Sequence, residues 1–166
     1  MTTGGRGCRI DAGQGASVWR VPRILLVNGP NLDQLGRREP EVYGSTTLPD
    51  IEAAFVATAS ELGAEAECAQ HAGEGDLVTA VHRGSADFDG IVINPGAYGH
   101  YGYALRDAIA ACDVPVIEVH ISNVHARESF RHELVLTPVV DGLVSGCGVV
   151  GYELALRACL ARVASR

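Results

Sequence analysis

Apolar and polar residues alternate in blocks along this chain, and the blocks predict strands and helices in turn. Short apolar runs bounded by glycine, proline or asparagine predict buried strands. Longer stretches with an apolar residue at every third or fourth position predict helices. The expected strands are 24–28, 65–70, 89–94, 114–117 and 143–145, and the expected helices are 47–62, 74–83, 102–111 and 149–164.

Strands that alternate with helices in this order predict a parallel sheet with helices on both faces. Five strands favour a flavodoxin-like α/β fold, a three-layer α/β/α sandwich with a five-stranded parallel sheet. The pattern starts at Arg23, so residues 23–166 are predicted to form a single domain. Residues 1–22 are rich in small and polar residues and have no apolar run, so we expect a flexible N-terminal extension there.

The helix expected over residues 47–62 is marked at both ends. Thr47 and Asp50 have the spacing of a capping box, in which each side chain binds the other residue's backbone N–H. Gly63 is expected just beyond the helix, where the chain often needs a left-handed backbone.

Polar residues appear abruptly where the apolar run 114–117 ends. Glu118 and His120 stand two positions apart, so on a strand they point to the same face. A carboxylate beside an imidazole fixes its tautomer and provides a proton donor or acceptor usable near neutral pH. Open α/β sheets bind ligands at the carboxyl ends of their strands, so this pair is a candidate catalytic group.

Two further strand ends carry candidate chemistry. The polar loop 28–45 is long for a compact domain and holds Tyr43 together with basic residues that include Arg38. An arginine stabilises a phenolate, so Tyr43 is a candidate general base, although a tyrosine packed on its own loop is the plainer interpretation. After the third strand, Asn94 and His100 are candidates for bonding substrate hydroxyls, although a lone histidine there is more often structural.

Composition removes several classes of protein. All basic residues are arginine, and without lysine the chain has neither a Schiff-base nucleophile nor a Walker-type phosphate loop. The net charge of −7 argues against a surface for nucleic acid or for an anionic membrane. The histidines and cysteines lack metal-ligand spacing, so no metal site is expected. Scattered, reduced core thiols fit a cytoplasmic protein.

One glycine-rich motif imitates a cofactor site. Residues 146–151 read Gly-Cys-Gly-Val-Val-Gly and match the dinucleotide-binding fingerprint, after a strand and before a helix. That fingerprint needs a further strand with an acidic residue about 20 positions on, and the sequence stops at Arg166. We therefore expect a tight turn and close helix packing here rather than NAD or flavin.

Taken together, the motifs resemble a known family. VNGPNL, LGRREPEVYG, INPGAYGH, ALRDA, EVHISNVHARESFR and SGCGVVGY are similar, in this order, to the motifs of type II 3-dehydroquinate dehydratase (type II dehydroquinase). The resemblance runs from Arg23 to the C-terminal helix. It implies a flavodoxin-like catalytic domain without a cofactor, assembled as a dodecamer that is built from trimers. It also implies a hydro-lyase of the shikimate pathway for aromatic amino acid biosynthesis, which converts 3-dehydroquinate to 3-dehydroshikimate through an enolate.

The resemblance implies catalytic roles residue by residue. Tyr43 is implied as the base that removes a proton from C2 of the substrate. Arg38 and Arg127 are implied as the positive groups that favour its phenolate. Asn31 is implied to hold the water that stabilises the enolate oxygen, an oxyanion-type role.

The resemblance further implies that His120, oriented by Glu118, protonates the departing C1 hydroxyl. The implied partner is a small cyclic hydroxy-keto carboxylate, bound through its carboxylate and its ring oxygens. The implied substrate-binding residues are Asn94, Ile121, Ser122, His100, Arg131 and, reaching a neighbouring subunit's site, Asp107.

The sequence departs from the family pattern beside these residues, where hydroxyls and an amide are lost. The replaced positions include Ala72, Gly99, Tyr101, Gly102 and Leu134. Beside an ordinary 3-dehydroquinate dehydratase, two alternatives therefore stay open. One is a paralogue that performs the same elimination on a modified, for example amino-substituted, dehydroquinate, and the other is a non-catalytic binding relative. Neutral drift at these positions is the plainer explanation of the departures.

Overall fold

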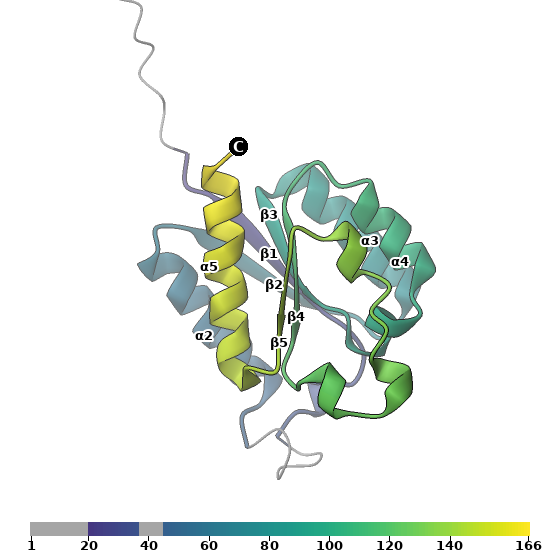
Figure 1. Ribbon diagram of the computed structural model, residues 1–166. Helices are drawn as coiled ribbons and strands as arrows, with labels where there is room; N and C mark the ends of the chain where they lie inside the picture. The colour runs from purple at the N-terminus through teal and green to yellow at the C-terminus, as the bar shows by residue number, and fades with distance from the viewer. Residues whose placement is uncertain (1–19, 37–44) are drawn as a thin grey trace, which may run out of the picture.

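The computed structural model describes residues 20–36 and 45–166, which fold into a sheet flanked by helices (Figure 1). Two predictions lie outside the described residues, wholly or in part. They concern the loop side chains of Arg38 and Tyr43 and the N-terminal extension, of which only residues 20–22 are described. Both stay predictions.

The sheet has five strands, all parallel, in the order β2-β1-β3-β4-β5. The strands are β1 (Arg23–Asn28), β2 (Glu65–Gln70), β3 (Gly90–Asn94), β4 (Val116–His120) and β5 (Gly142–Ser145). This order is that of the flavodoxin-like fold, in which ligands bind where the strand order reverses, between β1 and β3. The predicted fold class is therefore confirmed.

In the described part of the chain, four α-helices cover the sheet: α2 (Leu48–Glu61), α3 (Glu74–Asp87), α4 (Tyr103–Ala110) and α5 (Gly151–Ala164). Short 3-10 segments occupy the connecting loops, and they are η1 (Leu32–Gln34), η2 (Gly96–His100), η3 (Val124–Ala126), η4 (Ser129–Arg131), η5 (Thr137–Val139) and η6 (Gly148–Val150). Within residues 20–36 and 45–166, no helix combines the length and the apolar character needed to cross a membrane.

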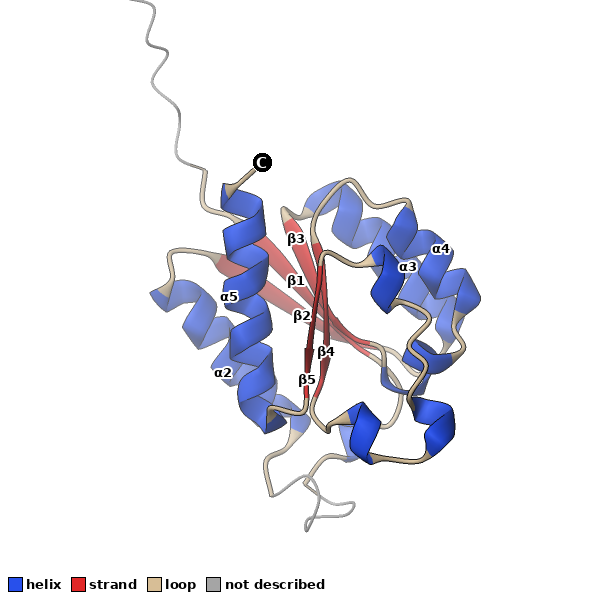
Figure 2. Cartoon of the chain, viewed as in Figure 1, coloured by secondary structure: helices blue, strands red, loops and turns tan. Residues whose placement is uncertain are grey.

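The sheet separates two hydrophobic cores. Helices α2 and α5 lie against one face, and α3 and α4 lie against the other (Figure 2). Alternate residues of β1 enter the two cores, with Ile24 and Leu26 on the α2–α5 side and Leu25 and Val27 on the α3–α4 side. Each fully buried aliphatic side chain contributes about 1.5–3 kcal/mol relative to an exposed one. The central strands are consequently a rigid base for the loops at their ends.

Helix α2 begins and ends where its flanking residues predict. The Thr47 side chain accepts a hydrogen bond from the Asp50 backbone N–H, and the Asp50 carboxylate accepts one from the Thr47 backbone N–H. Gly63 follows the helix with a φ of 75°, in the left-handed region that glycine adopts without strain. Both the capping box and the glycine end are confirmed.

Strand β4 differs from the expected range 114–117, because it begins at Val116 and continues to His120. Pro115 has no backbone N–H to donate to a neighbouring strand, so the ladder starts after it. The strand then runs through the polar residues that end the apolar run. Glu118 and His120 are therefore held by sheet hydrogen bonding rather than by a loop.

Helix α3 is longer than the expected range 74–83, since it continues to Asp87. Gly84, a residue that disfavours helices in isolation, lies inside it. A Cβ atom at Gly84 would lie 2.6 Å from the Cδ1 atom of Ile91, so the glycine lets the helix pack closely on β3. Tertiary packing here overrides the local preference.

The carboxyl ends of three neighbouring strands form one polar edge. Asn28 ends β1 and stands opposite Asn94, the last residue of β3. His120 ends β4 and stands opposite Ser145 of β5. Asn28, Asn94 and His120 are all buried, so the loops that leave these strands surround polar side chains fixed by the sheet.

Candidate active site

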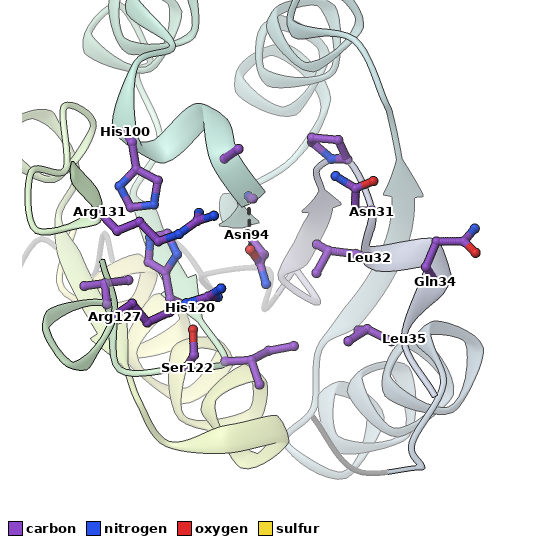
Figure 3. Close-up of a pocket in the computed structure, with 15 residues that line it drawn as sticks. Asn31, Leu32, Gln34, Leu35, Asn94, His100, His120, Ser122, Arg127 and Arg131 are labelled. Atoms are coloured by element: carbon purple, nitrogen blue, oxygen red, sulfur yellow. Dashed lines mark hydrogen bonds between the residues drawn. The ribbon is translucent and has the colours of Figure 1, made fainter. Parts of the chain in front are cut away.

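A cavity of about 240 Å³ opens at this edge, between the loops that follow β1, β3 and β4 (Figure 3). Its polar lining consists of Asn31, Gln34, Asn94, His100, His120, Ser122, Arg127 and Arg131. Its apolar wall includes Leu32, Leu35, Ile121 and Val124. The cavity thus gathers most of the predicted site residues that the structure describes.

Glu118 and His120 form a buried pair behind the cavity. The Nε2 atom of His120 lies 2.8 Å from the Oε1 atom of Glu118, and the Glu118 side chain is fully buried. An ionised carboxylate only accepts hydrogen bonds, so this contact places the proton of a neutral His120 on Nε2. The Nδ1 atom is left for a ligand. The prediction that the two side chains share one face is confirmed.

Thr137 was not singled out from the sequence, yet it completes this pair. Its hydroxyl donates to the second carboxylate oxygen of Glu118, Oε2, at 2.8 Å. Both oxygens of a fully buried carboxylate therefore have donors, which offsets the cost of burying its charge. In the sequence, the only sign was a polar residue inside the apolar stretch 135–140.

Gly99 lies beside the same pair. A Cβ atom at Gly99 would lie 3.1 Å from the Cε1 atom of His120 and 3.3 Å from the Oε1 atom of Glu118. The departure at this position therefore touches the candidate catalytic group directly.

His100 borders the cavity from η2. Its Nδ1 atom lies 2.9 Å from the backbone carbonyl oxygen of Glu133, which only accepts, so Nδ1 carries a hydrogen. Burial is the main cause that lowers the pKa of His100 below its ordinary value of 6.5, and the charges of His120 and Arg131 lower it further. A neutral His100 therefore offers an acceptor at Nε2, which suits a substrate hydroxyl.

Arg127 and Arg131 bring positive charge to the cavity from the segment after β4 (Figure 3). The Oε2 atom of Glu128 lies 2.9 Å from Nε of Arg131 and 3.5 Å from Nε of Arg127. The pKa of Glu128 is lowered, first by its own backbone N–H and then by these two guanidinium groups. Among the described lining residues there is no carboxylate, so the cavity of this acidic chain suits an anion.

The loops after β1 and β3 are held together by their backbones. The Gly29 N–H donates to the Asn94 carbonyl oxygen at 2.7 Å. Asn31 has a φ of 67°, a left-handed conformation that is uncommon for residues other than glycine and is often found at functional sites. Its side chain lines the cavity.

Asn94 is 3% exposed and has partners for both ends of its amide. Its Nδ2 atom donates to the hydroxyl of Tyr152 at 2.8 Å, and its Oδ1 atom accepts from the Gly96 backbone N–H at 3.2 Å. Tyr152, on α5, is 2% exposed and is not among the site residues predicted from the sequence. A buried tyrosine hydroxyl usually finds a partner, which was the available indication.

Of the described site residues, Glu118 and Asp107 do not line this cavity, and only Glu118 contacts a residue that does. Asp107 is exposed on α4, where its carboxylate lies 3.4 Å from Nη1 of Arg106. Its predicted place in a neighbouring subunit's site stays a prediction.

The glycine-rich motif over residues 146–151 forms a turn, as expected. Gly146 has a φ of 82°, and a Cβ atom there would lie 2.9 Å from the Cβ atom of Asn123. These glycines therefore let the chain turn from β5 into α5 against the segment after β4.

Comparisons with known proteins agree with this geometry. Residues 22–160 match the Dehydroquinase class II family. A 3-dehydroquinate dehydratase from Anoxybacillus flavithermus is 56% identical over 138 residues, which cover 83% of this chain and 93% of the relative.

Two crystal structures show the same fold. The type II dehydroquinase from Propionibacterium acnes is 45% identical, with a TM-score of 0.80 over 82% of this chain and 94% of its own. The type II dehydroquinase from Butyrivibrio crossotus is 42% identical, with a TM-score of 0.82 over 84% of this chain and 98% of its own. The chain described here belongs to the class II dehydroquinase family.

Proposed function

We propose that this protein is a 3-dehydroquinate dehydratase. It removes the elements of water from 3-dehydroquinate by trans-elimination through an enolate and releases 3-dehydroshikimate. The observation that carries the proposal is the cavity itself, in which two guanidinium groups and two imidazoles, with no carboxylate among the described lining residues, meet the needs of a hydroxylated carboxylate. Relatives of more than half-identical sequence carry the same name.

In the proposed reaction, Tyr43 removes the proton from C2, with Arg38 and Arg127 stabilising its phenolate. Asn31 holds a water that stabilises the enolate oxygen on C3. Arg127 and Asn31 line the same cavity, which supports their action on one substrate.

The second half of the reaction belongs to His120. Its imidazolium donates the Nδ1 proton to the C1 hydroxyl, the C1–O bond breaks, and the electrons of the enolate form the C1–C2 double bond. Glu118 supports this step because it accepts from Nε2 at 2.8 Å and stabilises the charged ring. A general acid of this kind typically contributes about 10²–10⁴-fold to the rate.

The remaining residues bind the substrate. We assign the carboxylate and the C1 oxygen to Asn94, Ile121 and Ser122, and the ring hydroxyls to His100 and Arg131. Asn94 ends β3, Ile121 and Ser122 directly follow β4, and all five residues line the same cavity, which supports a single binding region.

Beyond the single chain, we propose a dodecamer built from trimers, in which Asp107 reaches a neighbouring subunit's site. The exposed position of Asp107 on α4 supports this role. We also propose a cytoplasmic location, which the free thiols of Cys68, Cys112, Cys147 and Cys159 support.

The test is an ultraviolet assay for the conjugated enone product, with purified protein and 3-dehydroquinate. Wild-type protein is expected to give fast, saturable growth of absorbance. Tyr43→Phe removes the base and keeps the ring, so turnover is expected to fall by at least about 100-fold while circular dichroism stays unchanged. Substantial elimination by this variant would refute the assignment of the base, and a folded, inactive wild-type protein would refute the substrate.

A second candidate function is the same elimination on an amino-substituted dehydroquinate. The position of Gly99 favours it, because the residue that departs from the family pattern lies against His120 and Glu118. Parallel assays with both substrates decide between the two functions. A higher kcat/KM for the amino analogue would select the second.

A further inference from the structure

A chain of hydrogen bonds runs from the cavity into the protein, beneath Asn94. The Asn94 Nδ2 atom donates to the Tyr152 hydroxyl at 2.8 Å. The Tyr152 hydroxyl donates to the Oδ1 atom of Asn28 at 3.1 Å, and the Nδ2 atom of Asn28 donates to Oε1 of Glu52 at 3.1 Å. The chain connects the ends of β3 and β1 with helices α5 and α2.

The direction of this chain is fixed at both ends. Glu52 is half-buried on α2, and its ionised carboxylate only accepts, so Asn28 must turn its Nδ2 toward Glu52 and its Oδ1 toward Tyr152. The Tyr152 hydroxyl then donates to Asn28 and accepts from Asn94. At the other end, the Gly96 backbone N–H only donates, so it requires the Oδ1 atom of Asn94. Each end alone would give the same orientation.

The Tyr152 hydroxyl, in the middle of this chain of hydrogen bonds, keeps its hydrogen. Tyr152 is 2% exposed, and burial raises the pKa of its hydroxyl well above the ordinary value of 10. Asn28 is fully buried and Asn94 nearly so. Water therefore does not compete for these groups. Reversing one amide would place donor against donor or acceptor against acceptor, at a cost of about 1–3 kcal/mol per unpaired group.

We propose that Glu52, Asn28 and Tyr152 are positioning residues that hold the Asn94 amide with an N–H, and never its carbonyl oxygen, toward the cavity. One hydrogen of Nδ2 goes to Tyr152, and the second is presented to the ligand. The site therefore selects a hydrogen-bond acceptor at this point, such as a carboxylate oxygen. This inference rests on the proposed function for the identity of the substrate, but the orientation itself does not.

The first test removes the middle hydroxyl. Tyr152→Phe keeps the ring and breaks the chain, so Asn94 loses its orientation. Because this amide binds substrate and transition state alike, KM for 3-dehydroquinate is expected to rise about tenfold with kcat unchanged within about twofold. Tyr98→Phe is the matched control, since its hydroxyl donates to the Ala72 carbonyl oxygen at 3.4 Å and Tyr98 is not among the residues that line the cavity; its KM is expected to be that of wild type.

The second test acts from the far end, on another helix. Glu52→Met removes the terminal acceptor and is expected to raise KM about as much as Tyr152→Phe. Glu52→Gln keeps an acceptor oxygen of similar reach and is expected to restore KM to within about threefold of wild type. Glu61→Gln, on the exposed part of the same helix, is the control for charge. If these hydrogen bonds serve only the stability of the fold, the substitutions would lower the melting temperature and would not produce this pattern in KM.

The outcomes separate this inference from the proposed function. If wild-type protein turns over 3-dehydroquinate and Tyr152→Phe keeps a wild-type KM, the inference is overturned and the function stands. If the wild-type protein is inactive, the function is overturned, and crystals diffracting to about 1.2 Å decide the orientation, since amide nitrogen and oxygen differ there. An Asn94 Oδ1 atom facing Tyr152 in such a structure would overturn the inference.

Discussion

Two buried polar side chains, His120 and Asn94, line the cavity, and each is anchored on a carboxylate that is not part of the described lining. In the first, Glu118 holds His120 directly and is itself held by Thr137. In the second, Glu52 acts on Asn94 through two further side chains. The first carboxylate supports a group whose charge changes during the proposed reaction, whereas the second supports a group whose charge does not. Loss of the first carboxylate, Glu118, should therefore mainly lower kcat, whereas loss of the second, Glu52, should mainly raise KM.

The strongest way to test this comparison is to neutralise Glu118. Glu118→Gln keeps the shape but removes the negative charge beside Nε2 of His120, so the imidazolium loses its stabilisation. We expect kcat to fall by at least about 100-fold, with KM within about threefold of wild type. Steady-state assays at several pH values measure both constants. If most of the loss in kcat/KM instead comes from a higher KM, the two carboxylates do not differ in the way described.

A control for Glu118→Gln is Glu153→Gln. Glu153 lies on the surface of α5, where it pairs with Arg157 four residues on. The same chemical change there is expected to leave both constants unaltered.

A smaller effect is expected from Thr137→Val, which removes the hydroxyl at 2.8 Å from Glu118 and keeps the volume. One carboxylate oxygen then has no donor, and Glu118 holds His120 less firmly. We expect kcat to fall about fivefold to tenfold, in line with the cost of one buried unpaired group. Thr137→Ser restores the hydroxyl and should recover most of the activity. Equal losses in the valine and serine variants would assign Thr137 to packing alone.

The smallest expected effect concerns His100, which faces a backbone carbonyl rather than a carboxylate. Burial lowers the pKa of His100 below 6.5, so the ring is neutral and Nε2 accepts above that pH. As the pH falls through the lowered pKa, Nε2 gains a proton and the acceptor is lost. KM should therefore stay constant above pH 6.5 and rise as the pH falls below it.

The size of this rise is expected to be about fivefold, the worth of one neutral hydrogen bond. In His100→Gln, KM should no longer depend on pH, whereas His125→Gln, at an exposed histidine outside the cavity lining, should follow wild type. An unchanged pH dependence in His100→Gln would remove His100 from substrate binding.

What the sequence predicts well is local. The contact between Glu118 and His120 follows from the two-residue period of a strand, and the start of α2 follows from the spacing of Thr47 and Asp50. The parallel sheet with helices on both faces follows from the alternation of strands and helices. Each of these inferences uses neighbours in the chain, so no knowledge of packing is needed.

What the sequence does not predict depends on residues far apart in the chain. Tyr152 and Asn28 are separated by 124 positions, and no periodicity relates them. Thr137 reaches Glu118 only because η5 folds back over β4, and α3 passes through Gly84 only because Ile91 lies beneath it. Tertiary packing decides these contacts. Sequence motifs therefore identify the residues at the site, but they do not identify the distant residues that hold those side chains in place.

The place of Tyr152 in the sequence has a consequence for biosynthesis. Helix α5 follows all five strands, and ribosomes synthesise chains from the N-terminus. His120 and Glu118 are both translated before Tyr152, but the amide of Asn94 acquires its partner only when α5 docks against the sheet. The orientation of the Asn94 amide therefore waits for the last helix of the fold, which also packs on β4, the strand that carries Glu118 and His120.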